Sequence, residues 1–284
     1  MDQHNIINMI KDSEYLPKIP KDFGTIIKMF SKPIDYDIDQ CVEYFSHFPQ
    51  LETVLIQELN YDSRLKREIR TIKEAINYLG PKNSALIIIA YVTRLLIPNK
   101  YGRTKLFDSK KYWKHCLATS MAAYMISAEI KLSDKDKLFT YGLIHDIGIT
   151  VLDICLPDCL DKINEIHLKG THQLIAEKIV LNGITHAEIG GWICKEWGLP
   201  DEISDVVGFH HTPLLTDRNL DEVRIIHLAD SISTNYYERL LGNNTTFIYT
   251  NKIMEALNVN REFIDYIIEK IPSEVDKLNR IINF

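Results

Sequence analysis

The sequence predicts an all-α protein. Apolar residues recur at three- and four-residue spacing in one segment after another, which is the periodicity of an amphipathic helix. Two segments, Thr71 to Glu74 and Thr185 to Glu188, carry the capping-box pattern of a helix start. No alternation of apolar and polar residues is long enough to predict a strand. With 284 residues, 45% of them hydrophobic and 25% charged, the chain can bury the core of one large or two small domains.

Charge and cysteine content exclude several classes of protein. The formal net charge of −6 offers no basic surface for a nucleic-acid duplex, so we expect no duplex partner. The longest apolar run, residues 85–92, is far short of the ~20 residues of a membrane span, and no segment resembles a signal peptide. We therefore expect a cytoplasmic protein without membrane contact. The five cysteines are scattered and are expected to be small core residues rather than zinc ligands: Cys41, Cys116, Cys155, Cys159 and Cys194.

The N-terminal third is predicted to form short helices with little polar chemistry between them. Two closely spaced prolines favour an extended entry to a helix over residues 23–30, which we expect to dock on the fold. Apolar spacing predicts two helices over residues 38–59, with a break at Pro49. The capping box at Thr71 opens a further helix, and one more apolar helix follows before a loop at residues 99–102.

From about residue 110 the predicted helices carry histidine and aspartate. One helix has His115 near its start, and the next helix ends at His145 and Asp146. Adjacent residues on a helix project about 100° apart, so one of this pair can bind a metal end-on while the other reaches over it. Residues 149–160 are apolar and predicted to be helical, and another helix is predicted around residues 176–180.

Four more candidate ligands fall at helix ends or inside the core. The second capping box places His186 in the first turn of its helix, where a ligand is well held. His210 and His211 fall at the C-terminus of the next helix, which Pro213 ends. The helix that follows is apolar nearly all round and is therefore buried. Asp230 on that helix is then a core carboxylate, which must be paired, protonated or bound to metal.

The residues alone leave a simpler interpretation open. Any one of these histidines, taken by itself, is more often a satisfied core or surface residue than a ligand. His227 could support Asp230 or could simply fill the core. The chain beyond residue 244 is predicted to form one or two amphipathic helices that pack on the outside. Three lysines are expected to mark a solvated face, although they could attract a phosphate: Lys131, Lys135 and Lys137.

The order of these motifs resembles the HD-domain superfamily of metal-dependent phosphohydrolases, which is named for such a His-Asp pair. Over about residues 12–240 the chain resembles more closely the HDOD family, the HD-related output domains. The landmarks, in the family's order, are Leu16-Pro-Lys-Ile-Pro20, Phe48-Pro49, Leu59-Asn60, Ala75-Ile-Asn-Tyr-Leu-Gly80, Trp113-Lys-His115, Gly142-Leu-Ile-His-Asp146, Gly183-Ile-Thr-His-Ala187, Trp197-Gly-Leu-Pro200 and His210-His-Thr-Pro213. The resemblance implies a multi-helix HD-like core at residues 101–245, preceded by a helical N-terminal part at 1–100 and followed by a helical extension at 246–284. It also implies a role in bacterial signal transduction.

By analogy with two-metal members of the superfamily, the resemblance implies a ligand set. One ion would be held by His115, His145, Asp146 and Asp230, and Asp146 would bridge to a second ion held by His186, His210 and His211. Two ions about 3.5–4 Å apart activate water and stabilise charge on a phosphoryl group, and Asp146 would be the catalytic residue that orients the water. Imidazole-rich ligation favours iron or manganese, with zinc as a further choice, over magnesium.

The resemblance leaves two classes of function. An enzyme of this kind would be a hydrolase, a phosphohydrolase or phosphodiesterase acting on a nucleotide or cyclic nucleotide. Many HDOD members are instead non-catalytic output modules, and such a chain would bind a protein partner through its N-terminal helices or sense a nucleotide without cleaving it. Two departures argue against hydrolysis of cyclic-di-GMP: Ile149 stands where the HD-GYP branch has lysine, and Thr212-Pro-Leu-Leu215 stands where that branch has its Gly-Tyr-Pro motif.

Overall fold

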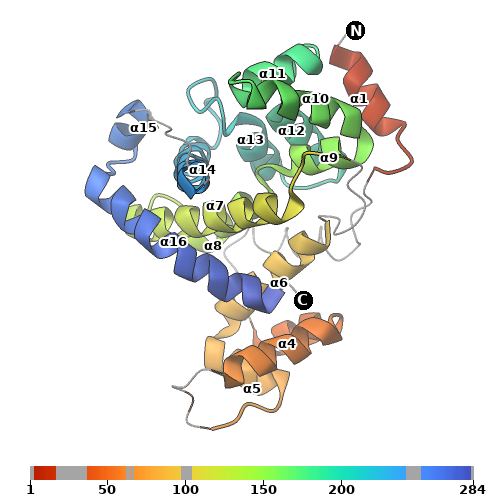
Figure 1. Ribbon diagram of the computed structural model, residues 1–284. Helices are drawn as coiled ribbons and strands as arrows, with labels where there is room; N and C mark the ends of the chain where they lie inside the picture. The colour runs from red at the N-terminus through yellow and green to blue at the C-terminus, as the bar shows by residue number, and fades with distance from the viewer. Residues whose placement is uncertain are drawn as a thin grey trace.

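The structure, a computed structural model, describes residues 3–16, 37–61, 65, 67–96, 104–240 and 251–282. These residues form fifteen helices and no strand, which confirms the predicted all-α fold (Figure 1). The predicted docking helix over residues 23–30 and the loop at 99–102 lie outside the described residues. In chain order the helices are α1 (Gln3–Lys11), α3 (Ile38–Ser46), α4 (Pro49–Asn60), α5 (Ile72–Leu79), α6 (Pro81–Leu96), α7 (Ser109–Ile130), α8 (Lys135–Ile144), α9 (Ile147–Cys155), α10 (Pro157–Leu168), α11 (Gln173–Val180), α12 (His186–Glu196), α13 (Asp201–Phe209), α14 (Leu220–Leu240), α15 (Asn251–Ala256) and α16 (Arg261–Ile282).

The two predicted capping boxes begin helices, but only one of them is complete. At α12 the Thr185 side chain accepts from the backbone N–H of Glu188, and the Glu188 carboxylate accepts from the backbone of Thr185. At α5 the Thr71 hydroxyl accepts from the backbone N–H of Glu74. The Glu74 carboxylate reaches one residue further back and accepts from the N–H of Arg70. Both arrangements satisfy donors that a helix start leaves without an intrahelical partner.

The apolar stretch at residues 149–160 is divided between two helices. α9 ends at Cys155, and α10 begins at Pro157. Proline lacks the N–H that would continue a helix, but its fixed φ suits a first helical position. The break turns the chain back, so that α10 packs against α9 and then against α11.

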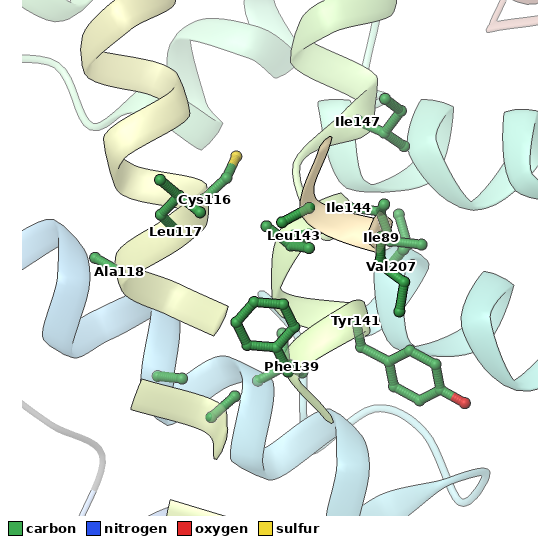
Figure 2. Close-up of a cluster of buried hydrophobic side chains, with 14 of the residues drawn as sticks. Ile89, Cys116, Leu117, Ala118, Phe139, Tyr141, Leu143, Ile144, Ile147 and Val207 are labelled. Atoms are coloured by element: carbon green, nitrogen blue, oxygen red, sulfur yellow. The ribbon is translucent and has the colours of Figure 1, made fainter. Parts of the chain in front are cut away.

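The core is centred on α7, which packs against α8, α14 and α16. In Figure 1, α16 runs alongside α7 and reaches the region of α4 and α6, and all three helices contact it. The C-terminal helix therefore joins the N-terminal helices to the central ones. Figure 2 shows side chains of the core between the helices, among them Leu117 from α7, Phe139 and Leu143 from α8, and Val207 from α13. All four are almost fully buried.

Two glycines allow helices to approach closely in this core. A Cβ at Gly142 on α8 would lie 2.6 Å from the Cα of Ser120 on α7. A Cβ at Gly148 on α9 would lie 1.9 Å from the carbonyl oxygen of His186, the first residue of α12. No side chain fits at either position. The second contact sets the start of α12 directly against the start of α9.

Among the residues that the structure describes, one stretch, Lys135–Cys155, has the length and the mean hydropathy (1.4) of a membrane-spanning segment. It comprises α8 and α9, which are separated at His145 and Asp146, and 89% of its most apolar window is buried inside the fold. Core segments have the same composition, because they face other helices on all sides. The stretch is accounted for as the packed centre of this fold.

Candidate metal centre

The seven predicted ligands converge in one cluster, although they are far apart in the sequence. Each comes from a helix end or a buried helix face, and none from an open loop. His115 lies on α7, His145 and Asp146 lie at the junction of α8 and α9, His186 is the first residue of α12, His210 and His211 follow α13, and Asp230 lies on α14.

Asp146 lies at the centre of the cluster, and its two oxygens face two different sets of histidines. Oδ2 is 3.3 Å from Nε2 of both His115 and His145. Oδ1 is 3.0 Å from Nε2 of His186 and 3.3 Å from Nε2 of His210. The carboxylate therefore divides the cluster into a half that contains His115 and a half that contains His186.

Asp230 and His211 complete the two halves. Oδ1 of Asp230 is 3.3 Å from Nε2 of His115 and 3.7 Å from Nε2 of His145. Nε2 of His211 is 3.0 Å from Nε2 of His186, and its Nδ1 is 3.6 Å from Oδ2 of Asp230. Three overlapping groups each bring their donor atoms within 4.8 Å of one another: Asp146 with His186, His210 and His211; His115 with His145 and Asp146; and His145 with His210 and Asp230.

The outer nitrogens of His145 and His210 are held in the same way. Each residue ends a helix, and its Nδ1 lies 2.7 Å from the carbonyl oxygen three residues earlier, that of Gly142 or of Val207. A carbonyl oxygen only accepts hydrogen bonds, so Nδ1 carries the proton in both rings. In the neutral ring, each Nε2 therefore directs a lone pair into the cluster, as a metal ligand must.

The outer nitrogens of His115 and His186 have side-chain partners. The Ser233 hydroxyl donates to the carbonyl oxygen of His115 at 3.1 Å, so its lone pair accepts from Nδ1 of the same residue at 3.0 Å. The Glu177 carboxylate accepts from Nδ1 of His186, at 2.7 and 2.8 Å to its two oxygens. In all four imidazoles Nε2 thus faces an aspartate carboxylate.

The buried carboxylates of Asp146 and Asp230 favour a cation in the cluster. Both aspartates are buried, and among the described residues their recorded ion pairs involve only histidines. Oδ1 of Asp146 and Nε2 of His210 are buried without a hydrogen-bond partner. Buried acceptors without donors are costly unless a positive charge faces them. Two buried carboxylates that are faced by imidazole nitrogens fit a divalent metal ion.

The pKa values show the same demand for positive charge. Burial lowers the pKa of His145, but the Asp146 and Asp230 carboxylates outweigh burial and bring it to about 10. Burial also opposes a charge on His186, but Glu177 and Asp146 raise its pKa well above the ordinary value. The pKa of His211 is held well below its ordinary value by burial and by the neighbouring histidines. The carboxylates of Asp146, Asp230 and Glu177 therefore favour positive charge at the buried centre of the cluster.

The cluster reaches solvent at one edge. The side chains of His145, His186 and His210 are 0 to 1% exposed, whereas those of His115 and His211 are 16% and 24% exposed. A ligand from solution would therefore first meet His115 and His211.

The structure adds supporting residues that sequence reasoning missed. Besides Glu177 and Ser233, the Tyr112 hydroxyl donates to the carbonyl oxygen of Asp146 at 2.9 Å. Thr234 donates to Oδ1 of Asp230 at 3.2 Å. The one sequence signal for Glu177 is a carboxylate on the buried face of a short apolar helix, and it becomes visible only once the orientation of α11 is known.

Other residues that the sequence raised serve structural contacts. Nδ1 of His227 lies 2.7 Å from the carbonyl oxygen of His210, so this ring holds the chain that carries two ligands. Lys137 pairs with Glu202 and lies 3.6 Å from Glu222, which makes it part of an ion-pair network between helices. The Lys135 ammonium donates to the Tyr124 hydroxyl.

Comparison with known proteins gives matches in sequence and in fold. A model of the HDOD domain family matches residues 16–213. An uncharacterised protein of Treponema pallidum (strain Nichols) is 21% identical over 198 residues, which are 69% of this chain and 37% of that protein. The chain therefore matches little more than a third of the length of this curated relative.

Two solved structures share the fold along their whole length. An HDOD domain protein of unknown function from Geobacter sulfurreducens superposes with a TM-score of 0.78 at 17% identity, covering 100% of both chains. A provisionally named phosphohydrolase from Shewanella amazonensis SB2B superposes with a TM-score of 0.73 at 17% identity, covering 99% of this chain and 100% of that chain. At such identities the likeness concerns the fold.

Proposed function

This chain belongs to the HDOD domain family, as its motifs predict, and on that premise we propose that it is a metal-dependent phosphohydrolase in bacterial signalling. Its substrate class would be the phosphate esters of nucleotides, with cyclic nucleotides included. The fold neighbour from Shewanella that carries a phosphohydrolase name supports this reading.

The observation that carries the proposal is the division of Asp146 between two sets of ligands. A carboxylate that gives one oxygen to His115 and His145 and the other to His186 and His210 suits a bridge between two cations. Imidazole nitrogens are softer ligands than carboxylate or water oxygens, so iron, manganese or zinc is favoured over magnesium, and the ligand set does not choose among these three.

The residues would divide the chemistry between them. When bound, two divalent ions supply Lewis-acid stabilisation of phosphoryl charge and make water a better nucleophile. A carboxylate oxygen of Asp146 would accept a hydrogen bond from the attacking water and so orient the water toward phosphorus. His115 and His211, at the solvent edge, would be the first residues to meet a phosphate ester. Buried His145 and His210 would keep the ligand field fixed during turnover, because their outer nitrogens are bonded to backbone.

The test is metal content and turnover of the wild type beside His145→Ala and Asp146→Ala. We expect near-stoichiometric iron, manganese or zinc in protein purified without chelator, and hydrolysis of a chromogenic phosphodiester or of a nucleotide in a screen. Both properties should disappear in the two variants while far-UV circular dichroism is unchanged. His167→Ala is the matched control, because that ring is exposed, belongs to none of the three ligand groups and contacts only the Thr171 carbonyl in the recorded bonds. A wild type that stays free of metal after reconstitution would refute the proposal.

The deep burial of the cluster favours a second candidate function. Three of its five histidines are 0 to 1% exposed, which suits an ion that stabilises the fold of a non-catalytic output module. Such a module would sense a nucleotide or bind a protein partner through its N-terminal helices. It would show ligand-dependent thermal stabilisation without product, and it would keep partner binding in His145→Ala.

A further inference from the structure

We propose that Glu177 is a positioning residue that creates the second ion site, the half of the cluster formed by His186, His210 and His211. The inference rests on the proposed metal binding and assigns one half of it to a residue outside the ligand set.

Glu177 makes three close contacts with His186. It is 1% exposed, on the buried face of α11. Its two oxygens lie 2.7 and 2.8 Å from Nδ1 of His186, and Oε2 also accepts the backbone N–H of that residue at 2.9 Å. Gln173, one turn earlier on α11, donates to Oε1 at 3.0 Å. The carboxylate thus fixes both the ring and the backbone of the first residue of α12.

Among the described residues, no other histidine of the cluster has a carboxylate within hydrogen-bond distance of its outer nitrogen; Nδ1 of His211 lies 3.6 Å from Oδ2 of Asp230. His145 and His210 are bonded to backbone carbonyls, and His115 to a neutral hydroxyl. A carboxylate on the outer nitrogen makes an imidazole a stronger electron donor than a carbonyl or hydroxyl does. His186 is therefore the strongest nitrogen ligand of the cluster.

The placement of Glu177 also balances the charges of the two halves. The half around His115 has a carboxylate of its own, Asp230, and shares Asp146. The half around His186 shares Asp146, but its remaining ligands are three imidazoles. Its own negative charge is that of Glu177, transmitted through the His186 ring. Without Glu177 that half would offer a dication only a shared carboxylate, so its affinity should fall while the other half keeps its ion.

The experiment measures ion stoichiometry with Mn²⁺ alone, which gives a readout independent of turnover. Chelator-stripped wild type, Glu177→Gln and Glu177→Asp are titrated with Mn²⁺ and followed by electron paramagnetic resonance, in which two bridged ions couple and a lone ion gives an isolated six-line signal. We expect two ions in the wild type. We expect one ion in Glu177→Gln, with ~10–100-fold weaker binding of the second. Glu177→Asp keeps the charge and should recover part of the second affinity.

A matched surface change controls for loss of charge. Glu165→Gln removes an exposed carboxylate on the neighbouring α10 and should bind like the wild type. If Glu177→Gln does not fold, Gln173→Leu decides, because it removes only the support of the carboxylate and should weaken the second ion severalfold.

The possible results distinguish a failure of the role given to Glu177 from a failure of the metal centre itself. Two ions in Glu177→Gln at wild-type affinity would overturn the role of Glu177 and leave the metal centre standing. If the fallback variant is needed, unchanged binding in Gln173→Leu would have the same meaning. A wild type that binds no Mn²⁺, Fe²⁺ or Zn²⁺ would overturn the metal centre itself.

Discussion

Gly148→Ala should remove metal binding although the residue is not a ligand. The new Cβ would lie 1.9 Å from the carbonyl oxygen of His186, whereas real Cβ contacts are essentially never under 3.0 Å. The starts of α9 and α12 would have to separate by about 1.1 Å, the difference between these two distances. Metal–ligand distances tolerate only about ±0.2 Å, so Asp146 and His186 would no longer reach a shared ion. Overpacking of this kind also costs about 1–3 kcal/mol of stability.

The assay is Mn²⁺ stoichiometry together with urea unfolding of Gly148→Ala and a matched control, Gly208→Ala. The Cβ of the control would meet nothing closer than the Cα of Gly191 at 3.9 Å, and alanine is the better helix former. We expect the control to bind metal normally and to be at least as stable as the wild type. Normal metal loading with an unchanged unfolding midpoint in Gly148→Ala would refute the argument that this contact sets the geometry of the centre.

Three further results are expected. Asp146→Asn removes the charge shared by both halves, so titration calorimetry should show both ions binding at least ~100-fold more weakly. This loss is larger than that expected for a residue that only supports a ligand. Retention of either ion at wild-type affinity would contradict the bridging role. Chelator should lower stability by about 2.7 kcal/mol for each bound ion, relative to protein with metal at 100 times the Kd of that ion, and an unchanged melting temperature would mean that metal does not bind the native state. Burial lowers the pKa of His145, but Asp146 and Asp230 outweigh burial and raise this pKa from 6.5 to about 10. Without metal, the protonated ring therefore stabilises the fold fully below pH 6.5. This contribution is lost as the pH rises toward 10. Metal needs the neutral ring, so the increase in melting temperature caused by Mn²⁺ should grow from pH 6.5 to 8.5; an increase independent of pH would argue against His145 as a ligand.

The ligand residues could be predicted from the sequence because local signals fix their places. The capping box at Thr185 sets the first turn of α12 and so the position of His186. The apolar surroundings of Asp230 predict a buried carboxylate, and it is 6% exposed. Each ligand lies in a segment whose structure depends mostly on its own neighbours in the chain.

The supporting residues could not be predicted, because their roles depend on contacts between helices distant in sequence. Ser233 meets His115 only after α14 has packed on α7. Glu177 occupies an ordinary helical position, and its burial follows from how α11 and α12 meet. Pro157 is compatible with a new helix start, but the apolar run on both sides of it hides the turn between α9 and α10.

The two pairs of adjacent ligands, His145–Asp146 and His210–His211, use helix termination for a second purpose. The last carbonyls of a helix lack intrahelical partners, and a side chain that donates to one of them stabilises the end. His145 and His210 do this with Nδ1, each to the carbonyl three residues earlier. The same bond places the proton on Nδ1 and so directs the Nε2 lone pair inward. The next residue, Asp146 or His211, leaves the helix and presents a second ligand beside the first. A substitution that cannot donate to the helix end, such as His210→Leu, would therefore remove a ligand and a helix cap together, whereas a polar replacement that restores the cap would recover stability without metal binding.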